Sequence, residues 1–323
     1  MKRHRVVLAL LGGLAGPLSV QANDAEALIE RMVGATKQLD YDGVFVYQRD
    51  GTLETLRVIH RGSGPTEMER LVSLSGPARE VIRDGRRVAV RSAASAGDVM
   101  VAERAPPKPP KFTILGDASG LAAVYHLSSQ QGLDRVAGRQ ARVVEIKPRK
   151  ADRYGYKLWV DEDTGLLLKT VILDERQRVL ELEQFADIKI GMPLEDAIFA
   201  TDLPDMAPAA DAPPTTQEPT TTGSADWTVG WLPEGFSRHK EFSCVSNAAV
   251  PKPVRQFMYS DGLASVSVFV EALHQGATPM QGFALMGAVN SYSRVTEGHQ
   301  VTVVGEMPQA TVRKIALSVA PRN

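Results

Sequence analysis

The chain has 323 residues, of which 43% are hydrophobic and 23% are charged, with 37 basic against 38 acidic side chains. Its length predicts two domains of about 100–200 residues each. The near-neutral charge argues against a strongly basic nucleic-acid-binding protein and against a wholly disordered acidic chain. Cys244 is the single cysteine, which excludes an intramolecular disulfide and any site built on several thiolates.

The first 22 residues have the order that is typical of a secretory signal peptide. Lys2, Arg3 and Arg5 precede an apolar run at residues 6–14, and a polar stretch then ends in compact residues up to Ala22. The run is short and interrupted by glycines and a proline, so it does not predict a membrane anchor. The alternative, a buried N-terminal helix, would leave the basic tip without a role. We predict an exported, soluble chain, cleaved after Ala22, with 34 basic against 38 acidic residues.

Residues 201–226 form the clearest boundary in the mature chain. This segment holds five prolines, runs of Thr and Ala, five acidic residues and no basic one. Such a composition cannot bury enough apolar surface to fold, and its prolines keep the chain extended. The sequence therefore predicts a linker between a domain at residues 23–200 and a smaller one at residues 227–323.

The first domain is predicted to open with a helix and to continue in strands. Asn23 can cap the helix, with Glu26 at its third position, and apolar residues recur behind them at helical spacing. Two β-rich runs, 43–48 and 53–60, flank a tight Asp50-Gly51 turn. Further strands are expected at residues 81–83, 86–91, 142–147, 156–160, 166–173 and 179–188, with a loop at 105–110 and a second helix at 119–129.

This succession of antiparallel hairpins with few helices predicts a mainly β fold. The large domain is expected to be a curved sheet or half-barrel with helices packed across it. The small domain is expected to be α+β. Its predicted strands lie near residues 254–260, 263–271, 300–305 and 311–319, and its predicted helix lies near 278–290.

No group of side chains forms a recognised catalytic or metal-binding pattern. The six histidines lack the spacing of a zinc site. Residues 161–163 resemble the start of a calcium loop, but Gly165 and Leu166 occupy the places of a ligand and of the turn glycine, so an acidic β-turn is favoured. Ser237 and Lys240 match the Ser-x-x-Lys of penicillin-recognising enzymes, but no Lys-Thr-Gly follows. We predict no catalytic residue, metal or cofactor, and an exported serine hydrolase ranks last among the alternatives.

Several segments, in order along the chain, carry a family resemblance. The first is YDGVFVYQR at residues 41–49, which continues as LETLRVIH at residues 53–60. Others are GRQA (138–141), IKPR (146–149), YGYKLWVD (154–161), TGLLLK (164–169), YSDGLASVSVF (259–269) and GHQVTVVGEMP (298–308). In these segments the chain resembles the RseB/MucB family of periplasmic negative regulators of the envelope-stress (sigma-E/AlgU-type) sigma factor.

The resemblance implies both a fold and a role. The large domain should look like the periplasmic lipoprotein carriers of the LolA/LolB type, an unclosed antiparallel β-barrel whose concave side is covered by helices. In the family, the protein binds the periplasmic region of a single-pass anti-sigma factor (RseA/MucA type) and shields it from the first regulated protease. Lipid or lipopolysaccharide weakens that complex. The resemblance therefore implies a periplasmic stress sensor.

Two groups of residues in the large domain are candidates for a lipid site. Apolar strand residues could line a hollow that takes acyl chains out of water, although ordinary core packing explains any single one of them as well. They are Val44, Val46, Leu56, Val58, Leu158, Val160, Leu167 and Val171. Arginines in one hairpin could meet phosphate headgroups, with a solvated strand face as the alternative. They are Arg79, Arg83, Arg86, Arg87 and Arg91.

Aromatic side chains are dense in the small domain and supply candidates for partner binding. A domain of this size hides so many with difficulty, and exposed aromatics commonly anchor peptide partners. The candidates are Trp231, Phe257, Tyr259, Phe269 and Tyr292. A flexible linker would let both domains hold one extended partner. A lipid or lipoprotein carrier is the alternative function, and the sequence leaves self-association and the state of Cys244 open.

Overall fold

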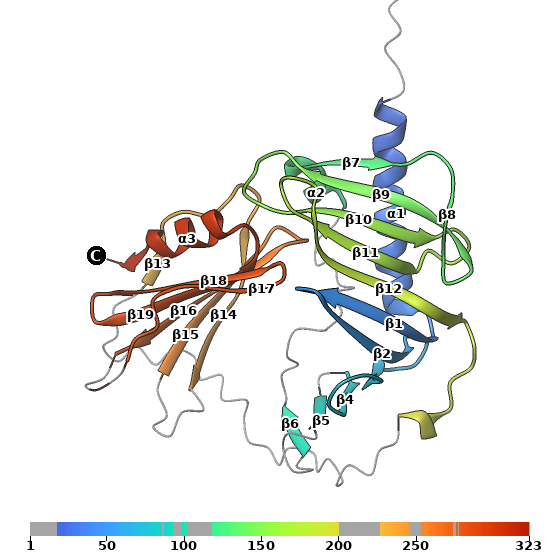
Figure 1. Cartoon of the computed structure of the whole chain (residues 1–323), viewed down its shortest axis with the longest axis horizontal. Helices are drawn as coiled ribbons and strands as arrows, with labels where there is room; N and C mark the ends of the chain where they lie inside the picture. Colours follow the sequence, from blue (N-terminus) through green and yellow to red (C-terminus); the bar gives the residue numbers. More distant parts are fainter. Residues whose placement is uncertain are drawn as a thin grey trace, which may run out of the picture.

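The computed structural model describes residues 18–85, 87–92, 99–102, 118–199, 227–245, 253–273, 276 and 278–322. Two large antiparallel β-sheets lie side by side, and a two-stranded ribbon and few helices accompany them (Figure 1). The predicted mainly β fold class is therefore confirmed. The signal peptide up to residue 17, the loop predicted at 105–110, the linker predicted at 201–226, Arg86 and the side chain of Cys244 lie outside the described residues.

The large sheet has twelve strands in the order β6-β5-β4-β3-β2-β1-β12-β11-β10-β9-β7, with β8 paired to β9. The end strands β6 and β7 do not pair with each other in the described part, so the sheet is unclosed, as expected. Its strands are β1 (Tyr41–Arg49), β2 (Thr52–Arg61), β3 (Met68–Ser73), β4 (Arg79–Asp84), β5 (Arg87–Ser92), β6 (Val99–Ala102), β7 (Tyr125–Ser129), β8 (Asp134–Val136), β9 (Arg139–Pro148), β10 (Gly155–Asp161), β11 (Leu167–Leu173) and β12 (Val179–Ile190).

The first hairpin forms as its sequence predicts. Arg49 pairs with Thr52, which leaves Asp50 and Gly51 as a two-residue loop. Both loop residues have positive φ, at 49° and 74°. A type I′ turn requires positive φ at both positions, and Asp-Gly supplies it at low cost while matching the twist of the strands.

Apolar side chains are buried on both faces of the large sheet. Successive residues point to opposite faces, so Leu167 and Leu168 enter different clusters. The helix-covered cluster joins α1 (Leu18–Gln38) and α2 (Ala118–Val124) to β7 and β9–β11. The strand-lined cluster takes every member from the strands themselves or from the turn before β11, and includes Phe45, Trp159 and Phe185.

Two predictions about the helices of the large domain are wrong. In the full chain α1 begins at Leu18, so Asn23 lies inside the helix instead of capping it; no glycine or proline between residues 18 and 23 would stop it. The helix predicted at 119–129 ends at Val124, and β7 follows. Alternate residues of β7 are buried against β9, so the period of two required by the sheet prevails over local helix propensity.

The small domain has a six-stranded sheet in the order β14-β15-β16-β19-β18-β17, a two-stranded ribbon and one helix. The helix, α3 (Gln309–Ser318), packs on one face of the sheet through Val312, Ile315 and Ala316. The strands are β13 (Trp227–Val229), β14 (Ser237–Val245), β15 (Pro253–Ser260), β16 (Ser265–Ala272), β17 (Gly282–Met286), β18 (Val289–Thr296), β19 (His299–Glu306) and β20 (Val319–Pro321).

Helix and strand were exchanged in two predictions for the small domain. The helix expected near 278–290 is the β17–β18 hairpin, and the strand expected near 311–319 is α3. Gly282 and Gly287 have positive φ and bound a strand of only five residues. In α3, the buried residues are Thr311, Val312, Ile315 and Ala316, which follow the helical period and not the alternation of the predicted strand.

We expect Ile315→Ala to lower the free energy of unfolding by about 2–4 kcal/mol. Ile315 lies on the inner face of α3 and is fully buried, so the change leaves a cavity. Urea denaturation followed by tryptophan fluorescence measures this. Leu317→Ala is the matched control, since Leu317 lies on the same helix but is exposed, and its change should stay within about 0.5 kcal/mol. Equal losses in both variants would contradict the observed orientation of α3.

Candidate binding site

The two domains are joined by a buried ion pair. Arg153, in the turn before β10, donates from Nη1 to Oδ2 of Asp261 at 2.7 Å, and the two side chains are 1% and 0% exposed. The Tyr125 hydroxyl donates to the same oxygen at 3.0 Å. Arg153 also donates to Asp152 and to the Glu234 carbonyl oxygen. Such complete pairing is what makes a buried charge tolerable.

The protonation states at this junction follow from burial and charge. Burial, reinforced by Tyr156 and Asp261, raises the pKa of the Tyr125 hydroxyl well above its usual range, so it stays a donor. Burial alone would lower the pKa of Arg153, but the hydrogen bond to Asp152 and the neighbouring acidic groups raise it overall. The guanidinium therefore remains charged.

Further buried polar contacts connect the same two domains. The Tyr156 hydroxyl donates to Oε1 of Glu306 at 2.9 Å. The Asn290 side-chain amide donates to the Tyr154 hydroxyl at 2.9 Å and to the Met307 carbonyl oxygen at 2.7 Å. These bonds have directional requirements, so they fix the orientation of the small domain on β10 as well as its contact.

The β17–β18 turn also sits on the large domain. The Gly287 N–H donates to Asp50 at 2.6 Å, and the Ala288 N–H donates to Glu181 at 2.8 Å. Glu181 accepts a second bond from the Tyr47 hydroxyl. Ala288 is fully buried within the helix-covered cluster of the large domain. A side chain at position 287 would collide with Glu181, so glycine is required there by the close approach as well as by its positive φ.

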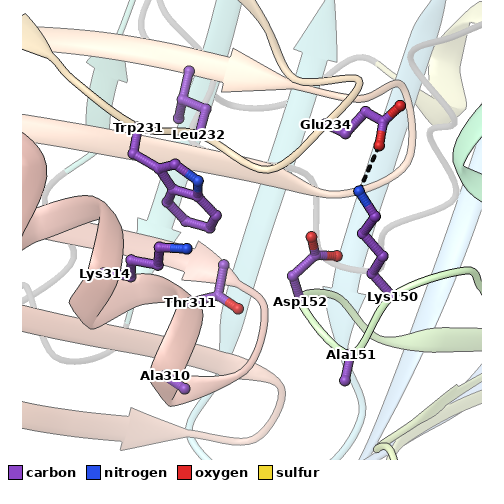
Figure 2. A pocket seen from close by; sticks show the side chains of 9 residues that line it. All are labelled: Lys150, Ala151, Asp152, Trp231, Leu232, Glu234, Ala310, Thr311 and Lys314. Atoms are coloured by element: carbon purple, nitrogen blue, oxygen red, sulfur yellow. Dashed lines mark hydrogen bonds and ion pairs between the residues drawn. The ribbon is translucent and has the colours of Figure 1, made fainter.

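A cavity of about 540 Å³ opens at the junction and is lined by both domains. Figure 2 shows Lys150 from the large domain paired with Glu234 from the small one, at 2.7 Å. On the opposite wall, Nζ of Lys314 lies 3.8 Å from the centre of the Trp231 ring. The cavity is lined by two lysines, two carboxylates and one tryptophan, which suits a small polar or aromatic group rather than a long acyl chain.

The candidate lipid-contacting residues do not line one hollow. Leu158, Val160 and Leu167 belong to the helix-covered cluster. Three others, Leu56, Val58 and Val171, belong to the strand-lined cluster on the other face. The last two, Val44 and Val46, are half-buried. Only Leu56, Val58 and Val171 therefore lie together on the face of the sheet where strands form the apolar cluster.

The arginines predicted to meet anionic headgroups do not gather on one surface. Arg83 is buried and pairs with Glu69 at 3.2 Å. Arg91 pairs across the sheet with Glu80 at 3.6 Å. Arg79 is exposed, while the side chain of Arg87, like Arg86, lies outside the described part. Cross-strand ion pairs therefore occupy two of the five.

Glu145 balances part of the basic stretch at residues 135–157. It accepts hydrogen bonds from Lys147 at 2.7 Å, Lys157 at 2.8 Å and Gln130 at 2.9 Å. Burial tends to raise the pKa of Glu145, but these three bonds outweigh it and lower the pKa to about 2. The stretch is thus a paired strand face more than a free cationic surface.

The predicted partner-binding aromatics are mostly internal. Phe257 and Tyr259 are buried in the small-domain core. Trp231 and Tyr292 are half-buried and pack against that core. Phe269 is half-buried on the opposite face of the sheet. None of the five is an exposed anchor in this structure.

In the small domain, exposed apolar residues gather at the edge strand β17. Phe283, Leu285 and Met286 are 46%, 58% and 50% exposed, and Met280 just before the strand is 63% exposed. They were not among the candidates from the sequence, because residues 278–290 were predicted to form a helix. The glycines that bound the run, Gly282 and Gly287, are the signal that could have indicated a short strand.

Two sequence motifs are structural in character. Ser237 and Lys240 lie on β14, opposite Ser260 and Met258, and not on one helical turn as a Ser-x-x-Lys site requires. In the second motif, the possible calcium loop at residues 161–163, Asp161 is buried and accepts two bonds from Arg139.

In the described part of the chain, no acidic, histidine or cysteine side chains cluster as metal ligands. No described helix is both long and apolar enough to cross a bilayer.

This arrangement defines a two-domain, mostly β protein whose charged side chains secure the domain junction and whose apolar edge faces solvent. Family models for the MucB/RseB N-terminal and C-terminal domains match residues 24–204 and 221–320. The chain therefore belongs to the MucB/RseB family of sigma factor regulatory proteins.

Relatives and solved structures agree over nearly the whole chain. The AlgU regulatory protein MucB of Pseudomonas aeruginosa is 37% identical over 99% of this chain and 98% of its own length. The sigma-E factor regulatory protein RseB of Escherichia coli is 27% identical over the same shares. A crystal structure of MucB in complex with MucA(peri) superposes with a TM-score of 0.71, at 33% identity, over 93% of this chain and 100% of that one.

We expect Asp261→Asn to lower the free energy of unfolding by about 3–5 kcal/mol. The amide keeps the size of the side chain but leaves the buried Arg153 guanidinium without its counter-charge. Urea denaturation is the measurement. Glu234→Gln is the control, because it breaks an ion pair of the same junction whose partners are both exposed, and it should change stability little. Similar effects of the two changes would contradict the central role of the buried pair.

We expect Glu145→Gln to flatten the acid limb of the stability curve. The pKa of Glu145 is lower in the folded state than the ordinary 4.5, so its stabilisation is complete above about pH 4.5 and is lost as the pH falls towards 2. The variant should lose up to about 3 kcal/mol at neutral pH and less at pH 2. Denaturation across this pH range measures the slope, with Glu54→Gln, an exposed carboxylate on β2, as control.

Proposed function

We propose that this chain is a periplasmic negative regulator of an envelope-stress sigma factor, acting by binding the periplasmic region of a membrane anti-sigma factor. The observation that carries the proposal is the full-length match to MucB, solved in complex with MucA(peri). A second crystal structure, of the Pseudomonas aeruginosa MucA/MucB complex, superposes with a TM-score of 0.72 at 34% identity. A bound regulator would shield the anti-sigma factor from regulated proteolysis.

The domain junction supports this role physically. Buried bonds through Arg153, Tyr156 and Asn290 hold the two domains in one orientation. A partner that contacts both domains then meets a preformed surface and loses less affinity to ordering of the receptor. From the sequence we expected a flexible linker to let both domains hold one extended partner. The junction adds that the two domains present one joined surface to that partner.

Export to the periplasm belongs to the same proposal. The N-terminal residues have the charge and apolar pattern of a signal peptide, with cleavage proposed after Ala22. Residues 1–17 lie outside the described part, and the side chains of α1 are described from Asp24 onwards. Cleavage after Ala22 would keep every α1 residue that is described as part of the helix-covered cluster, from Ala25 to Met32.

We also propose that lipid or lipopolysaccharide weakens the complex. The strand-lined cluster, with Leu56, Val58 and Val171, offers apolar side chains on a face of an unclosed sheet. Acyl chains that enter between its walls would gain about 0.8 kcal/mol for each buried methylene. Because these residues are already packed, entry has to part the strands, which couples lipid binding to a change in shape.

A lipid or lipoprotein carrier is the alternative. A carrier function would use the apolar cluster of the large domain. It would not explain the small domain or its exposed edge strand. The fixed junction therefore favours the regulator.

We expect the mature chain to bind the periplasmic region of its cognate anti-sigma factor and to slow its cleavage by the first regulated protease. Calorimetric titration and a cleavage time course measure the two effects, with an unrelated periplasmic peptide as control. Lipopolysaccharide should restore cleavage. Absence of binding would reject the regulator, whereas binding that lipopolysaccharide leaves unchanged would reject only the lipid response.

A further inference from the structure

The small-domain sheet ends at β17, and this edge is open. Among the described strands, only β18 pairs with β17, through five residue pairs from Gly282–Ser293 to Met286–Val289. An edge strand presents a row of N–H and C=O groups that another extended chain can satisfy. The chemistry of this edge therefore selects a β-strand as its occupant.

The register shows which backbone groups are free. The two-residue loop at Gly287-Ala288 closes the hairpin, so Met286 and Val289 form its hydrogen-bonded end pair. In an antiparallel ladder, hydrogen-bonded and non-hydrogen-bonded pairs alternate. The N–H and C=O groups of Phe283 and Leu285 consequently point to the open edge, whereas those of Ala284 point to β18.

The side chains of β17 itself are apolar and uncharged. Phe283 and Leu285 lie on one face, and Phe283 makes an edge-to-face contact with Tyr292, at 4.8 Å between ring centres. Met286 lies on the other face and is also exposed. No Asp, Glu, Lys or Arg occurs between residues 272 and 293. Natural edges usually carry a charge or a proline that blocks pairing, and β17 has neither.

The end of the edge strand is fixed to the large domain by hydrogen bonds. Asp50 and Glu181 bind the turn that follows β17. Exposed Leu53 and Val179 lie on the β1–β2 and β11–β12 hairpins that carry these contacts. A chain that runs along β17 and past the turn is therefore directed towards further apolar residues, which belong to the large domain.

We propose that β17 binds an extended, uncharged, apolar segment of the anti-sigma factor's periplasmic region by adding it as a seventh strand to the small-domain sheet. The proposal rests on the proposed function and specifies where the partner docks. Main-chain bonds at Phe283 and Leu285 supply the pairing, and the exposed side chains select an apolar sequence. A second copy paired β17 to β17 would be limited to the five residues of the strand, whereas an extended partner can continue past the turn towards the large domain.

Amide hydrogen exchange of the full mature chain, alone and with the anti-sigma periplasmic region, tests the backbone prediction. The amides of Phe283 and Leu285 should exchange freely in the unbound protein and become protected in the complex. The Ala284 amide, which points to β18, should be protected in both states. Protection confined to other strands would overturn the proposal.

Substitutions test the same edge by affinity. Phe283→Ser combined with Leu285→Ser should weaken binding at least about tenfold. Leu285→Pro should weaken it more than Leu285→Ser, because proline also removes the free N–H while sparing the pairing with β18. Leu317→Ser is the matched control, since Leu317 is an equally exposed leucine of the same domain, on α3.

The outcomes separate this proposal from the one on which it rests. Wild-type affinity in both edge variants, with the wild-type chain still binding the anti-sigma region, would overturn docking at β17 and leave the regulator standing. No binding by the wild-type chain would overturn both. Sedimentation adds a third outcome: a dimer of the free chain that the β17 changes abolish, and that the anti-sigma region does not dissociate, would assign the edge to a second copy.

Discussion

The buried pair of Arg153 and Asp261 is the contact on which the arrangement of the two domains depends. Removing two charges from water is expensive, and their attraction repays the cost only where the remaining donors and acceptors are also satisfied. Here Asp152 and the Glu234 carbonyl oxygen accept the remaining bonds of Arg153, and the Tyr125 hydroxyl donates to Asp261. The other oxygen of Asp261 accepts the N–H groups of Leu263 and Ala264 and so shapes the β15–β16 turn. The pair thus ties a turn of one domain to a turn of the other.

This contact makes the small domain an extension of the large one. Ala288, at the tip of the β17–β18 hairpin, is part of the helix-covered cluster that α1 and α2 complete. Leu263 packs against the same cluster from the β15–β16 turn. The core of the large domain therefore includes side chains that lie beyond the predicted linker. A movement of the strands under this cluster would therefore displace the β17–β18 hairpin, which carries the open edge. A regulator controlled by a ligand needs coupling of this kind.

Local features of the chain were readable from sequence, and long-range ones were not. The Asp50-Gly51 hairpin follows from two residues whose φ preferences decide the turn. The strands from β9 to β12 follow from alternating or continuous apolar runs. The Arg153–Asp261 pair joins residues 108 positions apart, and no local pattern indicates that those two charges meet. The same limit applies to Arg83 and Arg91, whose carboxylate partners depend on the register of β3 with β4 and of β4 with β5.

The exchange of helix and strand near residues 278–319 explains why the aromatic candidates for partner binding and the exposed apolar residues of the small domain are different sets. The aromatic count pointed to the small domain, but aromatic residues in β15 and β18 are needed to build a core against α3. Once α3 covers that face, the apolar residues left over are those that it does not reach, at β17. An exposed, uncharged edge strand carries a risk of aggregation that sequences normally remove with one lysine or proline. Its retention beside a fixed domain junction is accounted for if a partner strand covers it.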